Sequence, residues 1–246
     1  MAQRSFHAGR AISRGVATDA AGPVPAAALG TGAASTQPEH APATAQLRIR
    51  IADSVPPYLP VEAVPRGWAL KEFSGHASVT LMQAEPGLVL RLRSERTSFA
   101  LYHDAVVDLD EFPVLSWWWK VMQLPVRGDV RHHATDDQAA QVYVVFPRWP
   151  SPRTKSDVIG YVWDTTAPVD TRLVSAKASN VRIIVVESGA RGLGTWRRGQ
   201  RNVRDDYIAL FGRRPPRVGS IALMIDTDDT GGTAETLIGD LRFSRS

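Results

Sequence analysis

Three consecutive tryptophans followed by a lysine, Trp117 to Lys120, are the residues best suited to hold a ligand. The surrounding pattern predicts a β-strand, in which successive side chains point to opposite faces. Trp117 and Trp119 then share one face with apolar neighbours, and we expect both in the core. Trp118 and Lys120 share the other face, where an aromatic ring among polar groups is suited to stacking on a sugar or another planar ligand. The alternative for Trp118 is packing within the fold.

A second group of chemically active residues is the acidic run from Asp226 to Gly231, which contains Asp228 and Asp229. Carboxylates at alternate positions are the oxygen ligands that Ca²⁺ prefers, but an EF-hand loop needs Glu where this chain has Leu237. An EF-hand is therefore excluded. A calcium site formed by Asp226, Asp228 and Asp229 remains open, beside an Asx turn whose aspartates bind their own backbone. No other cofactor is expected. Asp226 is also a predicted partner for the charge of Lys120.

His132 and His133 lie close in the sequence to Asp136 and Asp137 and form the only histidine–carboxylate cluster. Adjacent residues of a strand face opposite ways, so the two imidazoles would not chelate one metal, and a solvated loop is favoured. Asp136, Asp137 and Asp226 are the candidate catalytic residues of a hydrolase or lyase acting on glycans. That reading requires two of these carboxylates across a cleft, about 5–10 Å apart, as in glycosidases.

Composition excludes several classes of protein. The chain has no cysteine, which removes disulfide scaffolds, thiol nucleophiles and cysteine-ligated metals. It contains no nucleophile elbow, phosphate-binding loop or zinc-protease motif. No run approaches the ~18 apolar residues of a membrane-spanning helix. Whether the chain is an enzyme stays open, and we favour a non-catalytic protein whose partner is a small molecule or a glycan.

Positive charge is concentrated in one segment. The net charge is only +4, but residues 191–217 hold eight arginines against Asp205 and Asp206, a local excess of +6. Such a segment could bind a polyanion through its arginines. Because phosphate binding needs a continuous surface stripe, a solvated face is favoured, and nucleic acid is a disfavoured partner.

Strands must position most of these residues, because apolar and polar side chains alternate with period two from residue 47 onward. One helix is expected over residues 203–211, with Asn202 at its N-cap and Gly212 after its end. Many short strands and one helix predict an all-β fold, an antiparallel β-sandwich of jelly-roll type. The expected strands cover residues 47–51, 88–93, 115–121, 141–146, 160–163, 181–187, 221–225 and 237–243.

Residues 1–46 differ from the rest in composition, since Ala, Gly, Pro, Ser and Thr fill 30 of these 46 positions. Such a segment buries too little apolar surface to offset its ordering entropy. We therefore expect a disordered or removed leader, followed by a single domain over residues 47–246. Three early arginines and the Ala-Thr-Ala pattern ending at Ala45 fit an export signal, but its apolar stretch is interrupted by Asp19 and two prolines. A periplasmic or secreted location and a cytoplasmic one both remain open.

Six motifs, in the same order, resemble a bacterial family known only as domain of unknown function 3047. The resemblance covers about residues 60–243 and implies a secreted or periplasmic protein, without implying a reaction or catalytic residues. Its end, an acidic turn followed by Gly-Asp-Leu-x-Phe, resembles galactose-binding-like jelly rolls. The chain departs from the family at Gly160 and Asp229, where the family has Asn, and residues 175–179 replace its Pro-Asn-Pro-Tyr run. The motifs lie at residues 112–121, 136–146, 161–163, 181–189, 201–216 and 221–231.

The sequence thus predicts a non-catalytic, envelope-associated module that binds a carbohydrate or another polyol. The predicted ligand surface is the sheet face of Trp118 and Lys120, joined by Tyr143, Trp163 and Arg182 if strand parity brings them together. The glycan hydrolase or lyase and the polyanion-binding protein are the alternatives.

Overall fold

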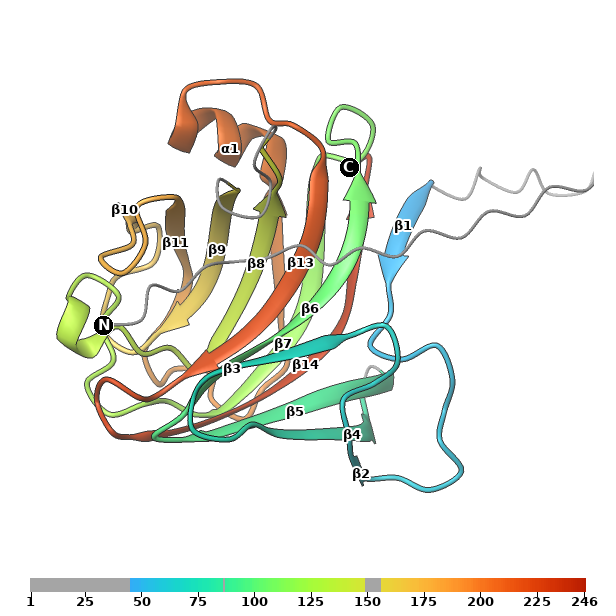
Figure 1. Cartoon of the computed structure of the whole chain (residues 1–246), viewed down its shortest axis with the longest axis vertical. Coiled ribbons are helices and arrows are strands. Elements are labelled where there is room, and N and C mark those ends of the chain that lie inside the picture. The colour runs from blue at the N-terminus through green and yellow to red at the C-terminus, as the bar shows by residue number, and fades with distance from the viewer. Residues whose placement is uncertain (1–44, 86, 149–155) are drawn as a thin grey trace, which may run out of the picture.

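The computed structural model describes residues 45–85, 87–148 and 156–246, which form two facing β-sheets and one α-helix (Figure 1). The expected leader lies outside the described residues except for Ala45 and Gln46, where the first strand begins. The elements are β1 (Gln46–Ile49), β2 (Val61–Glu62), β3 (Ala69–Ser74), β4 (Ser78–Ala84), β5 (Gly87–Glu95), β6 (Ser98–Val107), β7 (Val114–Gln123), the 3₁₀ helix η1 (His133–Thr135), β8 (Ala140–Phe146), β9 (Asp157–Asp164), β10 (Arg172–Val174), β11 (Val181–Ser188), β12 (Arg197–Asn202), α1 (Val203–Phe211), β13 (Val218–Asp226) and β14 (Thr233–Ser244).

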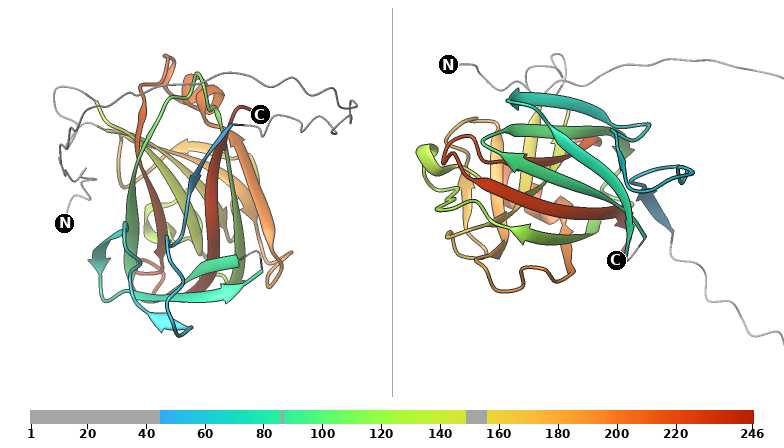
Figure 2. Two further views of the ribbon diagram at one scale, coloured as in Figure 1. Left: turned by 90° about the vertical axis from the view of Figure 1, so that its right-hand side faces the viewer. Right: turned by 90° about the horizontal axis from the view of Figure 1, so that it is seen from below.

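The two sheets have seven strands each. Sheet A has the order β12-β7-β14-β5-β4-β2, with β1 also paired to β14, and sheet B has the order β10-β11-β9-β8-β13-β6-β3. Among the described strands every pairing is antiparallel except that of β9 with β11. The sheets curve around a shared interior (Figure 2). This architecture confirms the predicted all-β jelly-roll sandwich.

Large aromatic side chains fill the space between the sheets. Trp117 and Trp119 of β7 are buried there, as predicted, together with Trp163 and Tyr161 of β9. Trp117 contacts Trp119 edge-on at 5.2 Å between ring centroids and stacks on Tyr161 at 5.5 Å. Burying such a side chain stabilises the fold by about 2–3 kcal/mol. The rings of β7 therefore fix the position of this strand and of its outward-facing residues.

The helix α1 has the predicted bounds and caps. The side chain of Asn202 accepts a hydrogen bond from the Asp205 backbone N–H, and Gly212 adopts a left-handed φ of 68° that ends the helix. The helix lies across one end of the sandwich (Figure 1), where its Tyr207 donates a hydrogen bond of 2.6 Å to Asp157. None of the described helices combines the length and the apolarity needed to cross a membrane.

The outer face of sheet B is also apolar, and its central strands β8 and β9 are buried along their whole length. A second apolar cluster on this face includes Val130 and Ala167, which lie in the loops after β7 and β9. Sheet A instead presents polar and charged residues on its outer face. The strand residues of the apolar cluster on sheet B are Ala100, Tyr143, Val145, Val158, Val162, Val181, Ile183, Val185, Ala222 and Met224.

Candidate functional site

A groove on the outer face of sheet A contains Trp118. Trp118 is 38% exposed to solvent, whereas its neighbours Trp117 and Trp119 are buried. The groove has a volume of about 540 Å³. We call it the Trp118 groove. Its lining residues are Gln46, Arg48, Gly87, Leu88, Ser116, Trp117, Trp118, Arg198, Asp240, Arg242, Ser244 and Ser246.

Strand register brings the charged residues of the Trp118 groove together. Arg198 of β12 lies directly opposite Trp118 of β7. Arg242 of β14 lies opposite Ser116 on the other side of β7, and Arg48 of β1 lies opposite Arg242. Directly opposite residues on one face have their Cβ atoms about 4.5–5.5 Å apart. Four neighbouring strands therefore present one continuous surface around the indole.

The lining side chains carry three guanidinium groups against the single carboxylate of Asp240, a net side-chain charge of +2. Asp240 is an ion-pair partner of Arg48, and its other oxygen accepts a 2.8 Å hydrogen bond from the Ile51 backbone N–H. Within the described part of the chain, Arg198 and Arg242 make no ion pair. Two cations at the groove are thus available to a ligand.

The structure does not bring the five predicted ligand residues together. Lys120 shares the outer face of Trp118 but lies opposite Leu237, outside the groove lining. Tyr143 lies on the outer face of sheet B, where its hydroxyl donates a 2.5 Å hydrogen bond to Gln141. Trp163 is buried between the sheets. Arg182 lies near α1, with its guanidinium 4.9 Å from the ring centre of Phe211.

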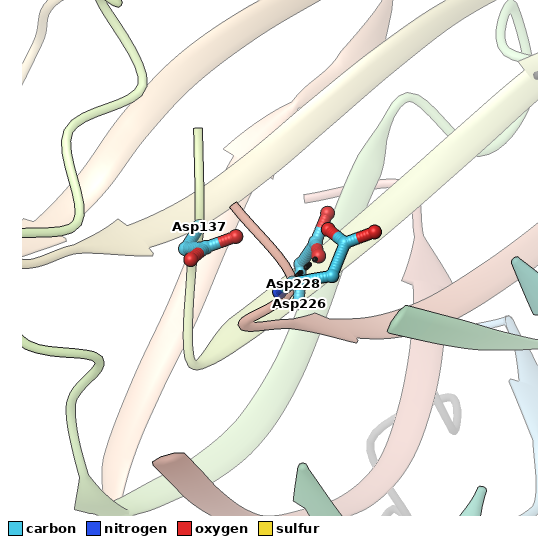
Figure 3. A group of neighbouring side chains, drawn as sticks. All are labelled: Asp137, Asp226 and Asp228. Atoms are coloured by element: carbon cyan, nitrogen blue, oxygen red, sulfur yellow. Dashed lines mark hydrogen bonds between the residues drawn. The ribbon is translucent and has the colours of Figure 1, made fainter. Parts of the chain in front are cut away.

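An acidic cluster forms where the turn after β13 meets the segment before β8. Asp137, Asp226 and Asp228 each place a carboxylate oxygen within 4.8 Å of the others (Figure 3). The fully buried Asp137 accepts hydrogen bonds of 2.6 Å from both the backbone N–H and the hydroxyl of Thr230. A third bond of 3.2 Å comes from the Asp229 backbone N–H. Asp137 therefore shapes the acidic turn.

Lys177, which the sequence did not single out, supplies positive charge to this cluster. Its Nζ atom lies 3.8 Å from Asp226 Oδ2, pairs with Asp229, and donates a 3.3 Å hydrogen bond to the Asp136 carbonyl. The predicted pair of Lys120 with Asp226 is wrong, because the two residues belong to different sheets. Lys177 lies between β10 and β11, and no local pattern in the sequence indicates that this segment reaches β13.

The calcium site remains a prediction, with Asp137 rather than Asp229 as the neighbour of Asp226 and Asp228. Calcium would share these carboxylates with the Lys177 ammonium. Adding calcium should raise Tm by about 2–4 °C for each kcal/mol by which binding stabilises the folded state. Differential scanning fluorimetry of the metal-free protein measures this shift, and Asp228→Asn should remove it. An unchanged Tm across millimolar calcium would contradict the prediction.

The geometry of the acidic cluster gives little support to the glycosidase alternative. Asp137 and Asp226 have carboxylate oxygens within 4.8 Å of each other, closer than the roughly 5–10 Å between glycosidase carboxylates, and Asp137 is buried and accepts three hydrogen bonds. The neighbouring cavity, lined by Asp136, Gln138 and Asp226 among others, has a volume of about 30 Å³. A cavity of that size admits about one water molecule. It does not admit a sugar ring.

The loop carrying the predicted histidine–carboxylate cluster is held by Asp129. This carboxylate accepts hydrogen bonds of 2.8 and 2.7 Å from the Arg131 guanidinium, which holds the pKa of Asp129 well below its usual range. His133 begins η1, and His132 is exposed with Nε2 4.0 Å from Asp129 Oδ2. Neither histidine belongs to a group of metal-ligand side chains in the described residues. The solvated-loop interpretation fits this arrangement.

The Asp129 pair predicts an acid-dependent contribution to stability. A carboxylate with a lowered folded-state pKa stabilises the fold above its unfolded pKa of about 4, and this stabilisation is lost as pH falls toward the folded-state value. Because Arg131 is partly exposed, we expect Asp129→Asn to lower the free energy of unfolding by only about 1 kcal/mol at neutral pH. Urea titrations at several pH values should show that cost shrinking below about pH 4. Asp104→Asn, on an exposed residue, is the control, and a cost independent of pH would contradict the account.

The arginine-rich segment is largely neutralised by aspartates. Arg201 pairs with Asp206, and Arg204 and Arg214 both pair with Asp110. Arg213 pairs with Asp157 and Arg217 with Asp108. The acidic partners come from α1, from β9 and from the loop after β6. Arg198 is its one member that lines the Trp118 groove.

Comparisons with known proteins identify a family and distant likenesses. Residues 66–242 match the family model described as "Protein of unknown function (DUF3047)". A search of curated proteins found no match.

Among solved structures, the chain is similar to the xyloglucanase domain of NopAA, a type three effector from Sinorhizobium fredii, with 10% identity, a TM-score of 0.39, and coverage of 76% of this chain and 95% of that one. An endoglucanase from Rhodothermus marinus shows 8% identity and a TM-score of 0.39, and the match covers 80% of this chain and 98% of the endoglucanase chain. The glycoside hydrolase domain of Endo-D from Streptococcus pneumoniae shows 12% identity and a TM-score of 0.37. That match covers 73% of this chain but only 22% of the Endo-D chain. At these scores the likenesses assign no reaction or ligand to this chain.

Proposed function

Since the chain belongs to the family of proteins of unknown function (DUF3047), we propose a function from its own geometry: a non-catalytic β-sandwich module that binds a carbohydrate or another polyol in the Trp118 groove. One observation carries the proposal. A partly exposed indole lies in a groove of about 540 Å³ whose other lining residues are mostly polar. Small-molecule sites typically have volumes of about 300–1,000 Å³.

The groove offers both kinds of contact that a saccharide needs. The indole face of Trp118 provides a flat apolar surface for the C–H face of a sugar ring, at a low cost in side-chain entropy. Around it, the guanidinium groups donate hydrogen bonds and the Asp240 carboxylate accepts them, while Gln46 and Ser116 can do both. Hydroxyl groups of a polyol both donate and accept, so this mixture suits them.

We expect Trp118→Ala to weaken carbohydrate binding at least tenfold, because the indole supplies stacking area that alanine lacks. Isothermal titration calorimetry on ligands found by glycan-array screening measures this change. Met122→Ala is the matched control, since Met122 is 42% exposed on the outer face of the same strand and lies outside the groove lining. An unchanged affinity in Trp118→Ala, or an equal loss in Met122→Ala, would contradict the proposed site.

A further inference from the structure

We propose that the saccharide held in the Trp118 groove is acidic, with its carboxylate or sulfate group bound by Arg198 and Arg242. This inference rests on the proposed function and adds the chemical class of the ligand. It begins from the position of the two guanidinium groups. Arg198 lies on one side of β7, opposite Trp118, and Arg242 lies on the other side, opposite Ser116. A sugar stacked on the indole would therefore have a cation on each flank.

The charges around the groove repel one another in the free protein. Arg48 and Arg242 are direct cross-strand partners, and like charges in that position destabilise a sheet. The Asp240 carboxylate offsets only part of the repulsion, because it is paired with Arg48 and is the one side-chain carboxylate beside three guanidinium groups in the groove lining. A bound anion would remove the remaining imbalance. The free protein thus keeps a local excess of positive side-chain charge in the groove.

Several other arginines of the chain are paired with acidic residues. Arg91 on the same outer face makes two hydrogen bonds of 2.9 Å to Glu235, and Arg213 reaches Asp157 at 2.5 Å. Arg204 and Arg214 share Asp110. In the described residues, Arg198 and Arg242 make no such pairs, although they lie beside the exposed indole. Two arginines without an ion pair in the described residues therefore lie on the surface best suited to a sugar.

The chemistry of the guanidinium group indicates what the ligand carries. Its planar donors bind a carboxylate or sulfate through two parallel hydrogen bonds, and charge-assisted bonds are about twice as strong as neutral ones. Two arginines flanking a stacking platform would discriminate in favour of an anionic sugar. Uronates and sulfate esters share this anionic chemistry, so the experiment must separate them.

Two matched ligand pairs test the inference by calorimetry. In the methyl ester of oligogalacturonate each carboxylate is converted to an uncharged ester that carries an added methyl group, and a sulfated galactan oligosaccharide and its desulfated form differ only in the sulfate. We expect the acidic member of at least one pair to bind at least tenfold more tightly, with affinity falling as salt rises. Arg198→Gln and Arg242→Gln should each reduce that preference about tenfold. Arg93→Gln, an exposed position of β5 outside the groove lining, makes the same change in net charge and should leave the preference intact.

The outcomes separate this inference from the proposed function. Equal binding of acidic and neutral members, unaffected by Arg198→Gln or Arg242→Gln but weakened by Trp118→Ala, would overturn the inference and leave the proposed function standing. An equal loss in Arg93→Gln would also overturn it, because attraction to net charge would then explain the preference. Binding of no saccharide of either kind would overturn both. Unchanged Tm values of the glutamine variants show that each variant is folded.

Discussion

Asp206→Ala is expected to lower the free energy of unfolding by about 3–5 kcal/mol, as the loss of one partner from a buried charge pair does. Asp206 is buried in the first turn of α1. It accepts hydrogen bonds of 2.9 and 2.5 Å from the Arg201 guanidinium and one of 3.0 Å from the Tyr161 hydroxyl. Burial, reinforced by Asp206, raises the pKa of Tyr161, so this hydroxyl remains a donor at neutral pH. Alanine leaves both donors without this acceptor.

Urea unfolding followed by tryptophan fluorescence measures the loss. Asp205→Ala is the control, since Asp205 is the preceding residue of the same helix turn and its side chain is 64% exposed. Its loss should stay below about 1 kcal/mol. We attribute the attachment of α1 to the sandwich to the contacts of Asp206 with Arg201 and Tyr161, rather than to acidic charge near the helix N-terminus. A similar loss of unfolding free energy in both variants would contradict this.

The second large effect is expected for Gly199→Ala, a loss of about 2–3 kcal/mol from overpacking. A Cβ atom at Gly199 would lie 2.2 Å from Cε2 and 2.3 Å from Cζ2 of Trp117. The indole has little room to move, because it is buried against Trp119 and Tyr161. The added methyl group must therefore push β12 away from β7. Since Arg198 precedes Gly199, weaker binding in the Trp118 groove should accompany the loss of stability.

A double-mutant cycle tests the steric origin of this effect. Trp117→Phe removes the part of the indole that the new methyl group would meet, so the two substitutions together should cost less than the sum of their separate costs. Gln200→Ala, an exposed neighbour on β12, is the control and should change stability by less than about 0.5 kcal/mol. Additive costs in the cycle would show that crowding of Trp117 is not the cause.

Local features of the fold could be predicted from the sequence because local periodicity determines them. The alternation around Trp118 separates the buried tryptophans from the exposed one, and the caps at Asn202 and Gly212 define α1. These assignments depend on residues within a few positions of each other. The jelly-roll sandwich followed from the number and spacing of such segments.

Which residues come together at each candidate site could not be predicted in the same way. Strand parity shows which face a side chain is on, but it does not show which sheet the strand joins. Parity allowed Tyr143 and Trp163 to join Trp118, but both belong to sheet B. Lys177 reaches the acidic turn from a segment with no distinctive pattern. Arg48 and Arg242 meet through the pairing of β1 with β14, at opposite ends of the described chain. Such contacts arise from tertiary pairing.

The pairing of β1 with β14 has a practical consequence for work on this family. The matched span, residues 66–242, includes Trp118, Arg198 and Arg242, but Gln46 and Arg48 precede it and Ser244 and Ser246 follow it. A recombinant fragment trimmed to that span would keep the aromatic platform and lose one wall of the groove, including the partner of Asp240. A negative binding assay on such a fragment would then reflect its boundaries rather than the protein. Screening should begin with a protein that retains β1 and the last residues of β14.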